Sequence, residues 1–192
     1  MRSPAQLLLV LLAAFVILAP RACCRAESPG EYDIKAALIY KLLPFVTWPD
    51  TDETPSSLTI GVVGKNPFGD TLREIEGRRI GSRSLVVRHF DTNADIAQLK
   101  RCQVLFLADA DEENLRRILQ AVSSWPILTI GDCPGFVDRG GVIGFVTRER
   151  RVAFEINQSA MAKASLAVRS QLMRLAARIV DTDPPTGEDT RE

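Results

Sequence analysis

The sequence has 192 residues, and its 24 Lys and Arg side chains are balanced by 24 Asp and Glu side chains, so its formal net charge at pH 7 is zero. Nucleic-acid binding relies on a surplus of basic side chains that neutralise phosphates, and this composition offers no such surplus. With one histidine and four cysteines, the chain also lacks the residues for a disulfide-rich scaffold or a histidine-rich metal site.

Residues 1–26 have the pattern of a secretory signal peptide. Arg2 is a short basic region, and the uncharged run at residues 7–18 is shorter than the roughly 20 residues that a membrane-spanning helix needs. We expect cleavage after Ala26 and export of the mature chain, with a retained anchor or a lipid-modified cysteine as alternatives. The mature chain would keep 166 residues with 21 basic and 24 acidic side chains, a formal charge of −3, and its size fits one domain.

The mature domain is expected to span residues 27–180 and to open with a helix. Ser28 and Pro29 suit an N-cap and a first-turn proline, and apolar residues follow at helical spacing. Pro44 should bend or end this helix, because proline lacks an N–H donor and clashes with the preceding turn. Trp48-Pro49 closes the element.

Between residues 57 and 131, apolar runs alternate with helical patterns. The predicted strands are 57–64, 84–90, 102–108 and 126–131, and the predicted helices or helical connections are 66–77, 93–99 and 111–125. Continuous apolar strands in such an alternation predict a parallel sheet that is covered on both faces.

The pattern changes after residue 140. Two strands at 141–147 and 151–157 fit an antiparallel hairpin. Residues 158–180 are expected to form one helix, or two helices that break between Ser165 and Ser170. Residues 181–192 are acidic and nearly without apolar side chains, so we expect a disordered tail.

The residues that could carry chemistry are few and scattered. A cysteine nucleophile at Cys133 would need a base, and the lone His89 comes without any recognisable orienting group. One histidine and two distant mature cysteines do not make a zinc site. Asp109 and Asp111 lack the spacing of a calcium loop, and Gly64-Lys65-Asn66 lacks the spacing and hydroxyl of a phosphate loop. We therefore expect no enzyme, cofactor or metal site, with an exported hydrolase as a distant rival.

The two mature cysteines, Cys102 and Cys133, are expected to lie at opposite ends of the sheet. Cys102 starts the third strand and Cys133 follows the fourth, so parallel strands would separate them by roughly 20 Å. A disulfide needs Cα atoms within about 7 Å. We expect free or intermolecular thiols, against the disulfide that an oxidising compartment would favour.

Five stretches, taken in order, resemble the YfiR-like family of small exported proteins. The resemblance runs from about residue 31 to residue 180. Its most specific pieces are the Phe and Trp-Pro that end the first helix, the PGF and GG before the hairpin, and the FEIN before the last helices. The five stretches are IKAALIYKLLPFVTWP, IGVVGKNPFGDTL, CQVLFLA, LTIGDCPGFVDRGGVIGFV and RVAFEINQSAMAKASLAVRSQLMRLA.

The resemblance implies a three-layer α/β/α sandwich, with the mostly parallel sheet and C-terminal antiparallel hairpin described above, and a regulatory role without catalytic residues. Such proteins bind the periplasmic sensor region of an inner-membrane diguanylate cyclase and hold it inactive, which lowers cyclic di-GMP and disfavours biofilm. An outer-membrane lipoprotein can sequester the regulator, and members are said to dimerise. Redox sensing through disulfides is associated with the family, so Cys102 and Cys133 inherit at most a partial redox role.

If the function is binding, aromatic and basic residues near the surface are the candidates. Tyr40, Phe45 and Trp48 end the first helix, while Phe136 and Arg139 belong to the glycine-rich loop. Trp48 and Phe136 each fit an interface anchor or a core residue. The arginines around the hairpin fit a solvated edge or a contact for an acidic partner. The rival function is a small-ligand binding module that uses the crevice at the carboxyl ends of the strands.

Overall fold

The computed structural model describes residues 29–49, 55–108 and 111–181. The expected signal peptide, Ser28, Asp109 and all of the expected tail except Asp181 lie outside these ranges. Predictions about those segments therefore stay predictions.

The described domain is built on an eight-stranded sheet with the order β10-β8-β7-β6-β5-β2-β4-β3. The five strands from β7 to β4 in this order run parallel to one another. The sequence predicts this for four of them, β6, β5, β2 and β4, whereas the parallel pairing of β7 with β6 is an addition. The central strands are buried along almost their whole length, because helices cover both faces. The strands are β2 Ser57–Val63, β3 Arg79–Ile80, β4 Arg83–Phe90, β5 Val104–Leu107, β6 Leu128–Gly131, β7 Ile143–Arg148, β8 Arg151–Asn157 and β10 Arg178–Val180.

The predicted antiparallel hairpin is confirmed as β7 and β8. Arg148 pairs with Arg151, so the connecting turn has only two residues, one fewer than expected. Both turn residues have positive φ, 50° at Glu149 and 64° at Arg150. Two successive positive φ angles match the tight turn whose twist suits a β-hairpin.

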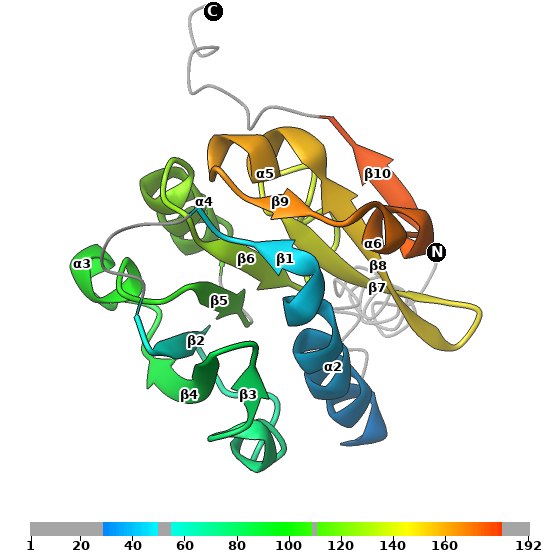
Figure 1. Cartoon of the computed structure of the whole chain (residues 1–192). Coiled ribbons are helices and arrows are strands. Elements are labelled where there is room, and N and C mark those ends of the chain that lie inside the picture. Colours follow the sequence, from blue (N-terminus) through cyan, green and yellow to red (C-terminus); the bar gives the residue numbers. More distant parts are fainter. Residues whose placement is uncertain (1–28, 50–54, 109–110, 182–192) are drawn as a thin grey trace, which may run out of the picture.

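The helices form two layers, which makes the domain a three-layer α/β/α sandwich (Figure 1). Buried side chains of α2, α5 and α6 belong to the core on one face of the sheet. Those of α3 and α4 belong to the core on the other face. No helix within the described ranges is both long and apolar enough to cross a bilayer. The helices are α2 Pro29–Leu42, α3 Ile96–Leu99, α4 Glu112–Val122, α5 Gln158–Lys163 and α6 Ser170–Leu175, with 3₁₀ helices η1 Leu43–Phe45 and η2 Arg73–Ile75.

The predicted helix at 66–77 is wrong. The segment forms turns, and η2 is its only helical turn. The Asn66 side chain accepts a hydrogen bond from the Phe68 amide at 3.0 Å and donates one to the Gly69 carbonyl at 2.9 Å. These local bonds satisfy the backbone groups that a helix would otherwise use.

The prediction of helix throughout 158–180 is also wrong in part. The helical conformation ends at Ser165, where φ is 54°. This position lies within the interval from Ser165 to Ser170 in which the sequence predicts a break. It then forms β9 at Ala167–Val168, α6 and β10. β10 pairs parallel to β8, and β9 pairs antiparallel to β1, Val46–Thr47, in a separate two-stranded sheet. Pairing with distant strands therefore overrides the helical pattern.

Candidate functional site

An open groove lies at the amino ends of the parallel strands, where α2 ends. We call it the amino-edge groove, and its volume is about 380 Å³. One wall comes from the segment that follows α2, and the other comes from β3 and the turn into β4. The lining residues are Leu43, Pro44, Val46, Trp48, Ile80, Gly81, Ser82, Arg83 and Arg169.

The sequence that follows α2 places Trp48 in the amino-edge groove. α2 ends at Leu42, and Pro44 continues the chain as the single 3₁₀ turn η1, as expected for a proline that cannot extend a helix. The Trp48 indole N–H donates to the Gln103 carbonyl at 3.3 Å, and Gln103 Oε1 accepts from the Thr59 amide at 2.9 Å. Trp48 is only 8% exposed, so it is a core residue whose edge also lines the groove.

Two arginines give the amino-edge groove its charge. The Arg83 guanidinium lies 5.1 Å from the centre of the Trp48 ring, which is cation–π distance. Arg169, which lies between β9 and α6, is exposed and also lines the groove. Its backbone amide donates to the Phe45 carbonyl at 3.0 Å, next to the β1–β9 pairing. Among the described residues, no acidic side chain lines the groove, and no carboxylate pairs with either guanidinium.

The other two aromatic residues predicted at the end of the first helix flank this groove. Tyr40 and Phe45 are half-buried and pack against the core that contains Trp48. The Arg78 guanidinium lies 5.6 Å from the centre of the Tyr40 ring. The structure therefore gathers Tyr40, Phe45 and Trp48 at one end of α2, with arginines over two of the three rings.

Phe136 is not available to a partner, because it is only 2% exposed. Its ring fills the space over two glycines. A Cβ added at Gly131 would lie 2.4 Å from the ring, and one at Gly141 would lie 2.1 Å from it. The alternative of a surface anchor is thus corrected: the glycines of this loop make room for a buried phenylalanine, which packs in the core on the α4 face.

Arg139 is exposed, but it lies apart from the amino-edge groove. It lines a smaller hollow of about 120 Å³ with Glu112, Arg116 and other residues along α4. α4 and Trp48 belong to the cores on opposite faces of the sheet. The five residues predicted for partner binding therefore do not form one continuous surface.

The carboxyl ends of the strands hold a buried charge network that sequence analysis missed. Lys35 is 2% exposed, and its Nζ lies 2.7 Å from Asp132 Oδ2 and 3.3 Å from Glu31 Oε1. The Tyr32 hydroxyl donates to the same Asp132 oxygen at 3.0 Å. The Tyr32 ring packs edge-on against Phe68, 5.4 Å between centroids. Side chains thus occupy the part of the carboxyl-end crevice beside Asp132.

The FEIN and PGF motifs also have structural roles. Asn157 is buried, donates to the Val137 carbonyl at 2.7 Å and caps α5 by accepting from the Ala160 amide at 2.9 Å. Glu155 is buried and lies 2.7 Å from Arg178 of β10 and 3.2 Å from Arg148. These contacts fasten the glycine-rich loop, the hairpin and the last strand together.

Cys102 and Cys133 are both free in the structure. Cys102 is buried just before β5, and Cys133 is half-buried two residues after β6. Burial raises the pKa of Cys102 to about 11. Burial also raises the pKa of Cys133, although the positive charge of Arg139 opposes this. Neither thiol has the low pKa of a reactive cysteine.

Catalysis by Cys133 and His89 has no support in the geometry. His89 is exposed on β4, while Cys133 follows β6, and β5 and β2 lie between these strands. Three strand spacings amount to roughly 14 Å. Among the residues with described positions, no group of three or more His, Cys, Asp or Glu side chains is placed to hold a metal ion.

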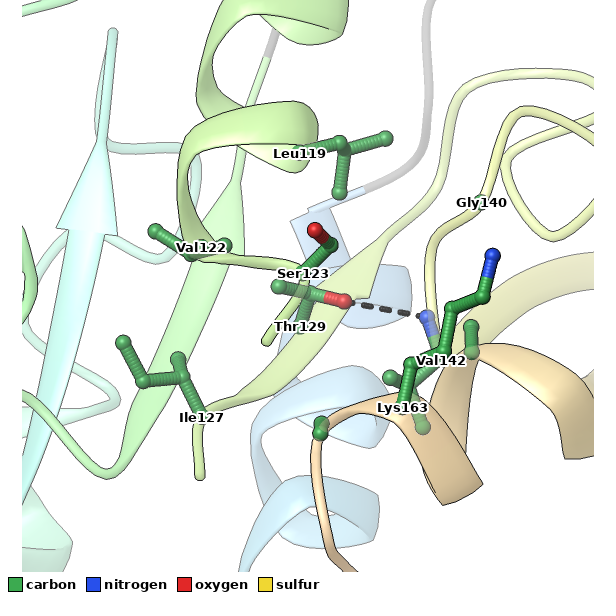
Figure 2. A pocket seen from close by; sticks show the side chains of 10 residues that line it. Leu119, Val122, Ser123, Ile127, Thr129, Gly140, Val142 and Lys163 are labelled. Atoms are coloured by element: carbon green, nitrogen blue, oxygen red, sulfur yellow. Dashed lines mark hydrogen bonds between the residues drawn. The ribbon is translucent and has the colours of Figure 1, made fainter. Parts of the chain in front are cut away.

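A small cavity between α4, β6 and α5 is shown in Figure 2. It has a volume of about 10 Å³, and one water needs roughly 10–15 Å³. Thr129 Oγ1 accepts a hydrogen bond from the Val142 amide at 3.0 Å beside it. The cavity is too small for an organic ligand.

Known structures resemble this fold at low sequence identity. A crystal structure of a conserved domain protein from Vibrio cholerae O1 biovar El Tor has a TM-score of 0.54 and 13% identity over 77% of this chain. The structure of an ABC domain in complex with L-Trp from Streptococcus pneumoniae has a TM-score of 0.52 and 12% identity over 78% of this chain. This chain spans 60% of the length of each. The likeness shows the α/β fold alone.

Sequence comparisons place the chain in a family. A comparison with curated proteins found no match. The model of the YfiR/HmsC-like family matches residues 32–177, which include the end of α2, the glycine-rich loop and the FEIN motif. The match covers well over half of the sequence and nearly all of the described domain, so the chain belongs to the YfiR/HmsC-like family.

Proposed function

We propose that the mature protein is an exported, non-enzymatic regulator that binds the periplasmic sensor region of an inner-membrane diguanylate cyclase and represses it. Membership of the YfiR/HmsC-like family is the observation that carries this proposal. Repression would lower cyclic di-GMP and disfavour biofilm. Release of the cyclase would follow when an outer-membrane lipoprotein sequesters the regulator, and a homodimer is the proposed form of the free protein.

The arrangement of side chains supports binding rather than catalysis. The amino-edge groove is open and combines apolar residues with two arginines. Arginine is enriched at protein–protein interfaces. By contrast, the groups that catalysis would use are apart: strands separate Cys133 from His89, and Lys35 is engaged with Asp132 and Glu31. No specific observation favours the rival small-ligand function, since Lys35 and Tyr32 pack against Asp132 at the carboxyl ends.

The deciding experiment measures cellular cyclic di-GMP in the native host. Deletion of the gene should raise the level, and the full-length gene should restore it. A matched gene that lacks codons 2–26 should not restore it, because its product would stay in the cytoplasm. An unchanged level after deletion, under conditions where the gene is expressed, would contradict repression of a cyclase. Restoration by the leaderless gene would contradict action in the periplasm.

A direct binding measurement complements the cellular one. The purified mature protein should bind the purified sensor region of the cyclase in biolayer interferometry or calorimetry. The cyclase domain alone, without its sensor region, is the matched control and should not bind. Binding to the control but not to the sensor region would overturn the proposed site of action.

A further inference from the structure

We propose that the amino-edge groove is the docking site for an acidic segment of the protein partner, with an apolar side chain on the groove floor and carboxylates on Arg83 and Arg169. The inference rests on the proposed function only for the identity of that partner. The chemistry of the segment is argued from the groove itself.

The floor of the groove is apolar and rigidly held. Leu43, Val46 and Trp48 line it and belong to the hydrophobic core. Trp48 is fixed by its hydrogen bond to Gln103. The groove volume of about 380 Å³ lies in the range of about 300–1,000 Å³ for pockets that bind organic groups. An apolar side chain of a partner therefore finds a preformed site here.

The charge of the groove is opposite to that of the mature chain as a whole. The expected mature chain has a net charge of −3, whereas Arg83 and Arg169 line the groove and no carboxylate of the described residues does. Arg78 and Arg79, the two residues before Ile80 of the groove lining, are also exposed. A local basic cluster on an acidic protein selects an anionic partner.

The two lining guanidiniums are available to that partner. Arg83 lies against the Trp48 ring, which limits its freedom while leaving its N–H donors for other acceptors. Arg169 is anchored through its backbone beside Phe45, and its side chain is exposed. Arginine binds carboxylates through two parallel hydrogen bonds. An apolar anchor with acidic side chains near it in sequence would match this arrangement.

A protein segment fits these observations better than an anionic membrane surface. Membrane binding needs a broad basic face that approaches a nearly flat layer of headgroups. Here two arginines line a concave groove around an indole, and the expected net charge of −3 opposes approach to an anionic bilayer. We therefore commit to an acidic peptide segment as the occupant.

The test uses charge reversal with a matched control. The double variant Arg83→Glu/Arg169→Glu changes the net charge by −4, and so does the control Arg88→Glu/Arg116→Glu, at two exposed arginines that do not line the groove. The groove variant should lose at least about tenfold in affinity for the purified cyclase sensor region, while the control variant should stay within about threefold. Equal losses in both variants, or none in the groove variant, would overturn the inference and leave the proposed function standing.

A second probe does not depend on the cyclase. The peptide acetyl-Glu-Leu-Asp-Glu-Leu-Asp-amide should change the fluorescence of Trp48 saturably in a Trp125→Phe background, where Trp48 is the only tryptophan left. Its Gln/Asn analogue should bind at least about tenfold more weakly. Absence of a saturable change with the acidic peptide, or equal binding of the analogue, would overturn the inference even if the protein binds no cyclase.

Two further measurements address unfolding of the Glu variant and binding to an anionic membrane. Arg83→Gln/Arg169→Gln removes the charge without placing carboxylates over Trp48, so it serves if the Glu variant unfolds. It should lose acidic-peptide binding while its thermal unfolding stays that of the wild type. Vesicles of phosphatidylglycerol test the other anionic partner. Binding to these vesicles that depends on Arg83 and Arg169, without binding of the acidic peptide, would assign the groove to the membrane and overturn the proposal.

Discussion

The Nζ atom of Lys35 lies 2.7 Å from Oδ2 of Asp132, across 97 residues of sequence. This contact holds the amino-terminal part of α2 against the carboxyl ends of the parallel strands. α2 has 14 residues, which corresponds to roughly 21 Å of helix, and its other end delivers Leu43 and Trp48 to the amino-edge groove. The buried ion pair and the groove are therefore opposite ends of one structural unit.

Removal of the Lys35 charge should strongly destabilise the fold. Lys35→Met would leave Asp132 and Glu31 without their buried cation, and breaking such a pair from one side costs about 3–5 kcal/mol. We expect the free energy of unfolding, measured with urea, to fall by about this amount. Lys41→Met, on the exposed surface of the same helix, should change it by no more than about 0.5 kcal/mol.

A double-mutant cycle isolates the energy of the contact between Lys35 and Asp132 from the effects of the surrounding residues. Lys35→Met together with Asp132→Leu removes both charges, and the double variant should be more stable than Lys35→Met alone, because it buries no uncompensated carboxylate at Asp132. If the two single changes simply add, the contact between Lys35 and Asp132 is not what holds α2 in place.

Sequence reasoning found one half of the candidate site and missed the other. Tyr40, Phe45 and Trp48 stood out because aromatic residues end a recognisable helix. Arg83 and Arg169 did not, because they meet the Trp48 segment only through tertiary structure. Arg169 reaches it through β1 and β9, two strands of two residues each, which are too short to leave a periodic pattern.

Gly141→Ala should destabilise the protein through the buried Phe136. The added Cβ would lie 2.1 Å from the Phe136 ring, so the ring or the loop must move, and overpacking of this kind costs about 1–3 kcal/mol. Thermal unfolding should therefore shift downward. Gly30→Ala, where a Cβ meets nothing within 4 Å, is the control and should be neutral or stabilising by up to about 1 kcal/mol.

A compensating change identifies the cause. Adding Phe136→Leu to Gly141→Ala frees space beside the new methyl group, so the double variant should recover part of the loss. Equal unfolding temperatures for Gly141→Ala and Gly30→Ala would show that the ring does not need the glycine.

The parallel core could be predicted because its strands are long enough to carry a signal. Residues 57–64 and 102–108 read as continuous apolar runs, and β2 and β5 form there. The sequence of residues 158–180 predicts too much helix, because its alanines and leucines favour helix in isolation. In the fold, Arg178 bonds to Asp138 and Glu155 and holds residues 178–180 as a strand. Those partners lie 40 and 23 residues away, beyond any local pattern.

The bond between Arg178 and Asp138 should make stability depend on pH in the acid range. The two guanidinium nitrogens lie 2.9 and 2.7 Å from the two carboxylate oxygens, and these hydrogen bonds lower the pKa of Asp138. A carboxylate with a lowered pKa stabilises the fold above its unfolded value of about 3.9, and this stabilisation is lost as the pH falls through the folded pKa.

The corresponding variant is Asp138→Asn. Because the carboxylate is 46% exposed, the wild type should exceed the variant by no more than about 1 kcal/mol of unfolding free energy between pH 5 and 8. The difference should shrink below about pH 4. A difference that stays constant down to pH 2 would mean that the side-chain charge of Asp138 does not contribute.

The two thiols should differ in their access to alkylating reagents. Cys102 is 2% exposed, and burial raises its pKa to about 11, so at pH 8 only about one thiol in a thousand is ionised. Iodoacetamide should therefore leave Cys102 unmodified in the folded protein, while the half-buried Cys133 reacts slowly. In guanidinium chloride both should react at similar rates, as peptide mass spectrometry would record.

Peptide maps without reductant should show no disulfide bridge between Cys102 and Cys133, because the two residues lie beyond opposite ends of adjacent parallel strands. Rapid labelling of Cys102 in the native protein, or an intramolecular bridge, would contradict the position of β5 in the sheet.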